Sequence, residues 1–140
     1  MKAQSQVPQG KLSERLPMLL SKLWVFLSLN YILCDLLTSM ETAVIKGLLE
    51  GNIGGIPVTA GFLLLAGISL EIPILMVVLS AVLPYKANRG INSGAAILMI
   101  LYQFGSFFVG SDTTLHYIFF SAVEILGNLA VLVLAARWKR

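Results

Sequence analysis

The sequence predicts an all-α polytopic membrane protein, a four-transmembrane-helix antiparallel bundle with cytoplasmic N- and C-termini. Composition is the first reason, because 57% of the 140 residues are apolar, 12% are charged and the mean hydropathy is +0.85. The apolar residues also form four runs, each close to the ~20 residues that a helix needs to cross a bilayer. Finally, the cations gather on one side of the expected bundle, as they do in membrane proteins of fixed orientation.

The chain divides into a polar N-terminal tail, a four-helix transmembrane domain at 18–136, and a basic C-terminal end. In the tail, Pro8, Gly10 and Pro17 are expected to prevent a long helix. A polar, glycine-containing loop is expected after the first span, with Pro57 at the start of the second. The expected ranges are 1–17 for the tail, 18–40, 57–83, 91–109 and 115–136 for the spans, and 137–140 for the C-terminal end.

Orientation follows from the basic residues, of which the sequence has 10. All but Lys46 lie before the first span or near its start, between the second and third spans, or at the C-terminus. Lys22 and Trp24 are expected to anchor the first span at the interface. Because Lys and Arg mark cytoplasmic segments, both termini are expected in the cytoplasm. The cations form no patch interleaved with aromatics, so the lipid bilayer is expected as a partner and nucleic acid is not.

Cysteine and histidine each occur once, as Cys34 and His116. An intrachain disulfide or a thiolate metal cluster is therefore not expected, and neither is a zinc site. We interpret Cys34 as a small buried apolar residue and expect His116 at the membrane–water boundary. The glycines after the first span lack the pattern of a phosphate-binding loop, so no cofactor is expected.

Three acids, Asp35, Glu71 and Glu124, interrupt the apolar runs. A carboxylate at the centre of a bilayer costs about 2.5–3.5 kcal/mol on insertion scales, so such a residue is a functional-site hypothesis. Pro73 is expected to kink the second span and to leave the Ser69 carbonyl without its helical donor. Each acid lies roughly 20 Å along its helix from the nearest cytoplasmic cation, which predicts one layer near mid-membrane.

Polar residues accompany the acids at helical spacing. The expected stripes are Ser28, Tyr31, Asp35, Thr38 and Thr42 on the first span, Asn92, Gln103 and Ser106 on the third, and Tyr117, Ser121, Glu124 and Asn128 on the fourth. Polar stripes of this kind have the lowest free-energy cost in a membrane when they are buried against one another. The third span also begins with Gly90 and Gly94, a spacing that permits close helix approach. The candidate ligand- or proton-binding residues are Tyr31, Asp35, Glu71, Ser121, Glu124 and Asn128.

Electrostatics limits what converging acids could do. Because no cation lies at their depth, the acids cannot all be ionised, so they share protons, bind a cation or are hydrated through a cavity. In the structural alternative, each acid stays protonated and only links helices. A membrane hydrogen bond gives about 0.6–2 kcal/mol, which falls short of the insertion cost of about 3 kcal/mol and favours a function.

Several short motifs resemble a bacterial family of small four-span membrane proteins of unknown function. They are Lys22-Leu-Trp-Val-Phe26, Asn30-Tyr31 with Asp35, Glu71-Ile-Pro73, Leu83-Pro-Tyr-Lys-Ala-Asn-Arg89, and Tyr117-Ile-Phe-Phe120 with Glu124. The resemblance covers roughly Leu20 to the C-terminus and implies a multi-pass protein of the bacterial inner membrane. It implies no activity and no cofactor.

Three functions remain open. In the first, proton-coupled transport or binding of a cationic or lipophilic small molecule, Glu71 and Asp35 bind and Glu124 tunes them. Small multidrug transporters are similar in scale, with four spans, an essential membrane carboxylate and dimeric assembly, so a homodimer is one expected form. This chain departs from them in its three acids and its charge bias, which argue against antiparallel pairing.

The second function is a membrane-embedded acid/base enzyme, an isomerase or cyclase that acts on an apolar substrate. Three carboxyl groups in unequal environments could supply its acid and its base. No nucleophile, metal or cofactor motif accompanies them in the sequence. The third is a structural or accessory subunit whose polar stripes bind partner helices.

Overall fold

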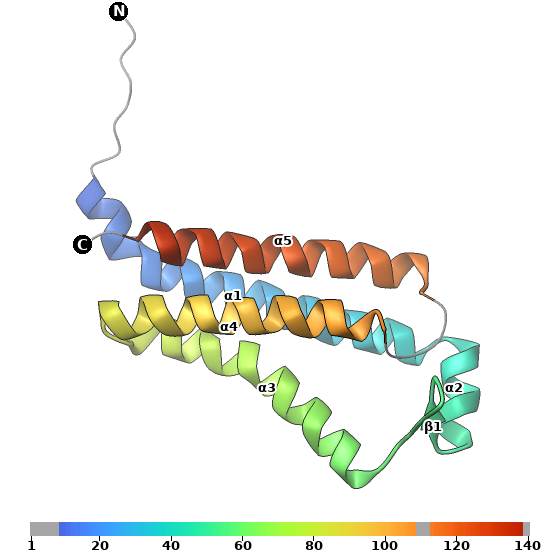
Figure 1. Cartoon of the computed structure of the whole chain (residues 1–140). Coiled ribbons are helices and arrows are strands. Elements are labelled where there is room, and N and C mark those ends of the chain that lie inside the picture. The colour runs from blue at the N-terminus through green and yellow to red at the C-terminus, as the bar shows by residue number, and fades with distance from the viewer. Residues whose placement is uncertain (1–8, 109–112, 139–140) are drawn as a thin grey trace, which may run out of the picture.

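The computed structural model describes residues 9–108 and 113–138 and is all-helical apart from one short hairpin (Figure 1). Three of its helices are long and apolar enough to cross a membrane. These three are α1, α3 and α5. The elements are α1 (Gln9–Ser39), α2 (Thr42–Leu49), β1 (Asn52–Ile53), β2 (Ile56–Pro57), α3 (Ala60–Val82), α4 (Tyr85–Ser106) and α5 (Leu115–Arg137).

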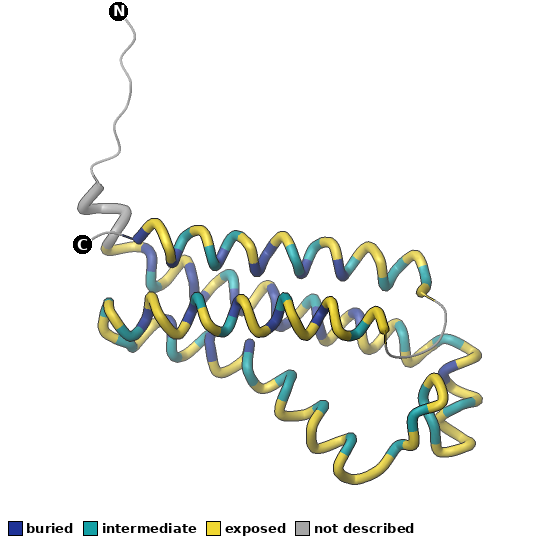
Figure 2. The backbone as a smooth tube through the Cα atoms, in the orientation of Figure 1, coloured by how far each residue is buried: buried dark blue, intermediate teal, exposed yellow. Residues whose placement is uncertain are grey.

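The four long helices lie side by side, with α1 packed against both α3 and α5, and α4 packed against α5 (Figure 1). The start of α1 and the end of α5 lie at one end of this bundle, while α2 and the hairpin lie at the other (Figure 1). The contact of α3 with α4 is less extensive, because the first half of α3 diverges from the bundle (Figure 2). The buried residues of α3, which are Pro73, Met76 and Ser80, all lie in its second half.

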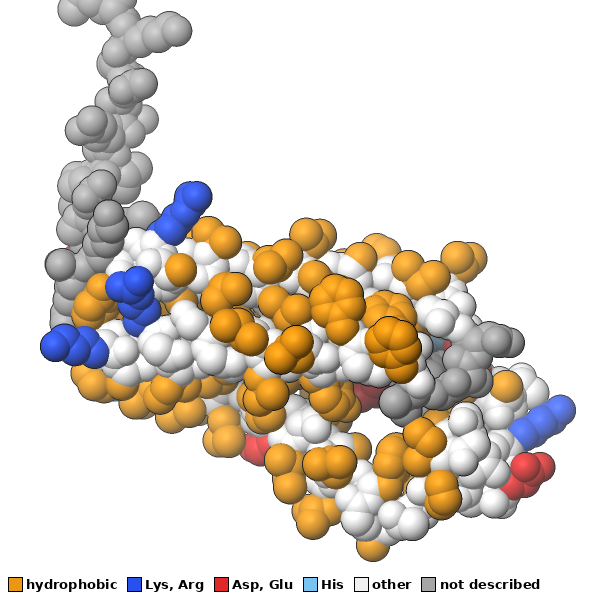
Figure 3. Space-filling model, viewed as in Figure 1, with side chains coloured by type: hydrophobic (Ala, Val, Ile, Leu, Met, Phe, Trp, Pro, Cys, Tyr) orange, Lys and Arg blue, Asp and Glu red, His pale blue; other side chains and the backbone are white. Residues whose placement is uncertain are grey.

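Pro73 marks the point at which α3 leaves the bundle. The helix stays continuous through Pro73, although a proline ring removes one hydrogen bond and displaces the carbonyl four residues earlier. Before Pro73 every residue of α3 is at least partly exposed, and from Pro73 onward one face is buried. The divergence leaves a space beside α1 and α4, toward the end of the bundle that carries α2 (Figure 3).

A buried polar network joins α1, α3 and α4. The Asn92 side-chain oxygen accepts hydrogen bonds from Trp24 Nε1 at 2.7 Å and from Ser80 Oγ at 3.0 Å. Asn88 Nδ2 donates to the Ser80 carbonyl at 2.7 Å. The prediction that Trp24 is an interfacial anchor is therefore wrong, because its indole N–H has an internal acceptor and the side chain is 0% exposed.

The N-terminal helix begins earlier than expected. α1 starts at Gln9 and runs through Gly10 and Pro17, so these residues do not prevent a long helix. A proline in a helix forfeits one hydrogen bond, while the neighbouring turns continue on either side of it. Leu16 is buried in the core, so packing of this turn offsets that loss. The expectation of a polar tail at residues 1–8 lies outside the described residues.

The expected loop after the first span contains α2 and the β1–β2 hairpin. Gly54 and Gly55 connect the two strands with φ angles of 55° and 84°. Positive φ at both central residues is the geometry of a type I′ hairpin turn, for which glycine has no steric penalty. Because Pro57 lies in β2, it does not start the next helix. The cap of α3 is Thr59, whose side chain accepts a hydrogen bond from the Phe62 N–H at 3.1 Å.

Helix α4 also begins before its expected start at residue 91. Pro84 precedes it in an extended conformation, and the helix starts at Tyr85. Most of the segment between the expected second and third spans, at 84–90, is therefore the first turns of α4. Gly90 and Gly94 are exposed, and a Cβ atom at either would meet nothing within 4 Å. Their spacing accordingly serves no close contact within the described chain.

Gly127 is the close-approach glycine between α1 and α5. A Cβ atom there would lie 2.7 Å from Leu27 Cδ2, and Leu27 is itself fully buried. We expect Gly127→Ala to destabilise the protein by about 1–3 kcal/mol through overpacking, measured by denaturant titration in micelles. Gly94→Ala is the control and should be neutral or slightly stabilising, because alanine favours a helix. Equal effects of the two changes would contradict this packing argument.

Candidate functional site

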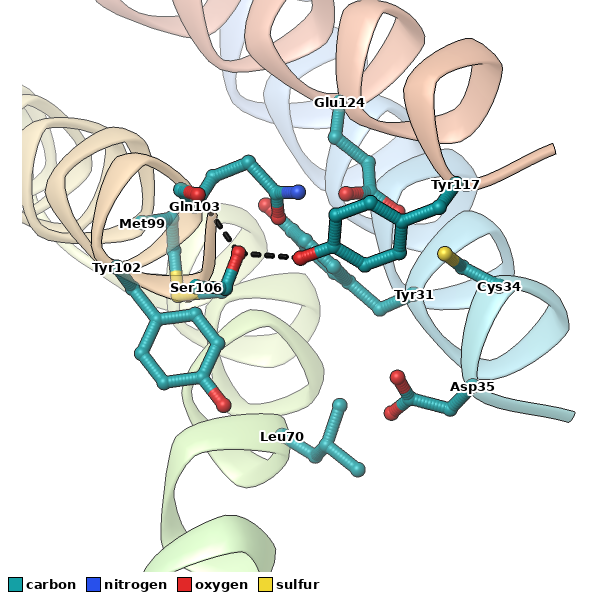
Figure 4. Close-up of a pocket in the computed structure, with 10 residues that line it drawn as sticks. All are labelled: Tyr31, Cys34, Asp35, Leu70, Met99, Tyr102, Gln103, Ser106, Tyr117 and Glu124. Atoms are coloured by element: carbon teal, nitrogen blue, oxygen red, sulfur yellow. Dashed lines mark hydrogen bonds between the residues drawn. The ribbon is translucent and has the colours of Figure 1, made fainter. Parts of the chain in front are cut away.

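A cavity of about 80 Å³ lies between α1, α3, α4 and α5, in the half of the bundle from which α3 diverges (Figure 4). Three tyrosines and two carboxyl groups are among the residues that line it. The lining residues are Tyr31, Cys34, Asp35, Leu70, Met99, Tyr102, Gln103, Ser106, Tyr117 and Glu124. None of these described residues is basic, so no lining side chain can neutralise a carboxylate.

Glu124 is the most enclosed acid of the cavity. Helix α5 buries one face, and the three- and four-residue steps from Ser121 to Glu124 and Asn128 keep these side chains on it. Glu124 is 1% exposed, and its Oε1 is buried without a hydrogen-bond partner among the described residues. Because buried polar groups in proteins are nearly always hydrogen-bonded, this oxygen requires a proton, a water molecule or a bound group.

Asn128 and Tyr31 support the Glu124 side of the cavity. Asn128 Nδ2 donates to the Tyr31 hydroxyl at 2.7 Å and to the Glu124 backbone carbonyl at 2.8 Å. The first bond ties α5 to α1 and fixes the tyrosine ring beside the cavity. The Asn128 side-chain oxygen is also buried without a hydrogen-bond partner among the described residues, although Asn128 itself does not line the cavity.

A second set of hydrogen bonds joins α4 to α5 around the cavity. Gln103 Nε2 donates to Ser121 Oγ at 2.6 Å. Ser106 Oγ pairs with the Tyr117 hydroxyl and also bonds the Gln103 carbonyl at 2.7 Å (Figure 4). These contacts fix Tyr117 against the end of α4. Ser121, a predicted ligand-binding residue, is buried and holds Gln103, and it does not itself line the cavity.

Asp35 lies at the more open side of the cavity, since it is exposed whereas Glu124 is buried. Thr38 Oγ1 and His116 Nε2 are 3.2 Å apart, which sets the two helices at the same level there. The two acids thus line the same cavity from α1 and α5 and differ in exposure.

Glu71 lies elsewhere. It is exposed on α3 and does not line the cavity, although its neighbour Leu70 does. Residues two apart on a helix point about 200° apart, so Glu71 faces away from the buried side of Pro73. The structure thus brings together Asp35 and Glu124, and leaves Glu71 on the outer surface of the bundle.

The size of the cavity limits its contents. A volume of about 80 Å³ is enough for a few water molecules or for one small ion. Drug-sized ligands occupy pockets of about 300–1,000 Å³. Among the described residues, no group of three or more His, Cys, Asp or Glu side chains could hold a metal ion. The chemistry available is therefore proton binding, hydration and hydrogen bonding to a small guest.

The sequence matches the model of a known protein family. The model of a family described as "Family of unknown function (DUF6326)" matches residues 11–140. The chain belongs to this family. The DUF6326 match confirms the resemblance to an uncharacterised family and extends it to nearly the whole chain. No curated protein and no solved structure matches the sequence.

Some features of this DUF6326 protein were not anticipated. His116 bonds Thr38 and Thr114 and lies 3.4 Å from a carboxylate oxygen of Glu41, so it links the end of α1 to the start of α5. Cys34 also lines the cavity, and its position three residues after Tyr31 is a helical spacing that could have placed it there. The sequence offers no comparable signal for Leu70 on α3.

Proposed function

We propose that this DUF6326 protein crosses the bacterial inner membrane four times, with both termini in the cytoplasm. Besides the three apolar helices, α4 has 22 residues, and its amides Asn88, Asn92 and Gln103 are at most 4% exposed. The surface that α4 offers to lipid is therefore largely apolar, which suits a fourth span. Among the described residues, cations lie mainly at the end of the bundle where α1 begins and α5 ends (Figure 3), as the rule for cytoplasmic segments requires.

Within this bundle, the proposed function is proton-coupled binding or transport of a small cation. The observation that carries it is the unsatisfied Glu124 oxygen, 1% exposed and facing a cavity that Asp35 also lines. Two carboxyl groups in one cavity without a basic lining residue resist simultaneous ionisation, so a cation that enters should displace a proton. Between the cationic and lipophilic guests expected from the sequence, the volume of about 80 Å³ favours a compact cation.

Each group has a distinct role in this proposal. Asp35, at the open side, would meet the cation first, and Glu124 would bind it or the proton at the enclosed side. The unsatisfied Glu124 oxygen accepts hydrogen bonds, so a guest with N–H donors, such as ammonium or methylammonium, suits it. The rings of Tyr31, Tyr102 and Tyr117 line the same cavity, and aromatic faces attract cations.

The test is proton release and carboxyl infrared absorption in purified protein reconstituted in lipid, with methylammonium chloride added at fixed pH. We expect methylammonium to release protons and to reduce the absorption of protonated carboxyl. Glu124→Gln should abolish both signals, because the amide cannot exchange a proton. The matched control is Glu71→Gln, which alters a carboxyl outside the cavity and should leave both unchanged. Proton release that persists in Glu124→Gln, or none in the wild type, would refute the proposal.

One observation favours the acid/base enzyme as a second candidate. Asp35 is exposed and Glu124 is buried, and such unequal environments can hold one carboxyl protonated and the other ionised. An apolar substrate would need the cavity to widen where α3 diverges. Overexpression of the wild type, but not of Glu124→Gln, should then change the lipid extract of the host cells. An unchanged extract would exclude this candidate.

A further inference from the structure

Glu71 occupies a costly position that the cavity does not explain. It lies eleven residues from each end of α3, roughly 16 Å along the axis, which is too far for its side chain to reach either end. It makes no hydrogen bond or ion pair with any described residue, and it is exposed. A carboxyl group facing lipid at this depth costs about 3 kcal/mol, so a partner from outside the chain would be stabilising.

The face of α3 around Glu71 has the shape of a helix-packing surface. Residues three or four positions apart on a helix share a face, and all such neighbours of Glu71 are exposed. One turn away, Gly67 has open space where a Cβ atom would lie, which permits close approach of another helix. This outer face comprises Leu64, Gly67, Ile68, Glu71, Ile74, Leu75, Val78 and Val82.

We propose that this outer face of α3 is the interface with a second copy of the chain, in which the two Glu71 side chains meet and share a proton. Glu71 is the one ionisable group on the face, so a partner must bring a hydrogen-bonding group to the same depth. A second copy in the same orientation does so, because a twofold interface places a residue near the axis against its own equivalent. A carboxyl pair with a shared proton is self-complementary, since one group donates and the other accepts.

This surface is separate from the cavity, so the inference rests on the membrane placement and not on cation binding. The charge bias supports copies with a common orientation, which both Glu71 side chains need to meet at one depth. Apolar residues on either side of Glu71 supply van der Waals packing, the main source of helix association in lipid. A polar group at the centre of such an interface adds specificity.

Cysteine crosslinking in washed native membranes tests the interface. In a Cys34→Ala background, Leu75→Cys on this face should give a disulfide-linked dimer upon mild oxidation. The control is Leu129→Cys, at similar depth on the exposed side of α5, which should stay monomeric. The interface is refuted if Leu129→Cys forms a dimer and Leu75→Cys does not. It is also refuted if both variants stay monomeric. Absence of the protein from the membrane fraction would instead refute the membrane placement.

The role of Glu71 is tested by the dimer dissociation constant, measured by energy transfer between labelled copies in vesicles. Glu71→Val should raise this constant roughly 3- to 18-fold, the range that measured membrane hydrogen bonds imply. Glu71→Gln keeps a donor and an acceptor and should retain most of the affinity. An unchanged constant in Glu71→Val, or co-purification of a different protein in stoichiometric amount on this face, would overturn the proposal.

Discussion

Replacing Trp24 with alanine should cause the largest loss of stability of any single change described for this protein. The side chain is 0% exposed and belongs to the core cluster with Leu20 and Leu27. Removal of a buried tryptophan side chain costs about 3–5 kcal/mol, because the cavity collapses only partly. The lower part of this range applies in a membrane, where lipid is as apolar as the core and the loss is mainly one of packing. Denaturant titration in micelles measures the effect.

Two further variants separate packing from hydrogen bonding at Trp24. Trp24→Phe keeps most of the ring volume and removes the donor to Asn92, which still accepts from Ser80. Its expected cost is about 1 kcal/mol, the net value of one hydrogen bond. Phe104→Ala removes an aromatic ring that is 51% exposed and should have a much smaller effect than Trp24→Ala. If the two alanine variants were equally stable, Trp24 would not be a core residue.

The fold could be predicted from the sequence wherever a single signal, such as a long apolar run, determines the local structure. Long apolar runs suffice to indicate helices, and the expected fourth span at 115–136 agrees closely with α5 at Leu115–Arg137. Boundaries near proline were harder to predict, because a proline can end a helix, start one or lie inside one. Pro17 lies inside α1, whereas Pro84 precedes α4. Tertiary packing decides between these outcomes, and local sequence does not encode it.

For the candidate site, helical spacing predicted neighbours on one helix but not which helices would meet. Tyr31 and Asp35 on α1 and Glu124 on α5 share a cavity, as their polar stripes suggested. Glu71 was expected among them because its depth is similar, yet depth does not fix rotation about the helix axis. The burial of Pro73 sets that rotation and turns Glu71 outward. The interfacial role predicted for Trp24 was wrong for a related reason. Its hydrogen-bond acceptor, Asn92, lies on a different helix, and spacing along one helix does not reveal such a partner.

Asn88→Leu should destabilise the turn between α3 and α4 by about 2 kcal/mol or more. Asn88 Nδ2 donates to the Ser80 carbonyl at 2.7 Å and to the Leu83 carbonyl at 3.2 Å, and both lie at the C-terminal end of α3. The last carbonyls of a helix have no helical donor, and Pro84, four residues after Ser80, has no N–H to offer. Leucine has a similar volume, so the change isolates the hydrogen bonds from packing.

The cost arises mainly at the Ser80 carbonyl, whose hydrogen bond to Asn88 is buried inside the bundle, where water cannot replace the lost donor. Asn88 is 0% exposed, and an unsatisfied buried group costs about 1–3 kcal/mol. The matched control is Asn30→Leu, because Asn30 Nδ2 bonds the Phe26 carbonyl, which a helical N–H can also satisfy. That change should alter stability by less than about 0.5 kcal/mol. If both leucine variants unfold at the same denaturant concentration, Asn88 does not hold the end of α3, and the α3–α4 turn depends on packing alone.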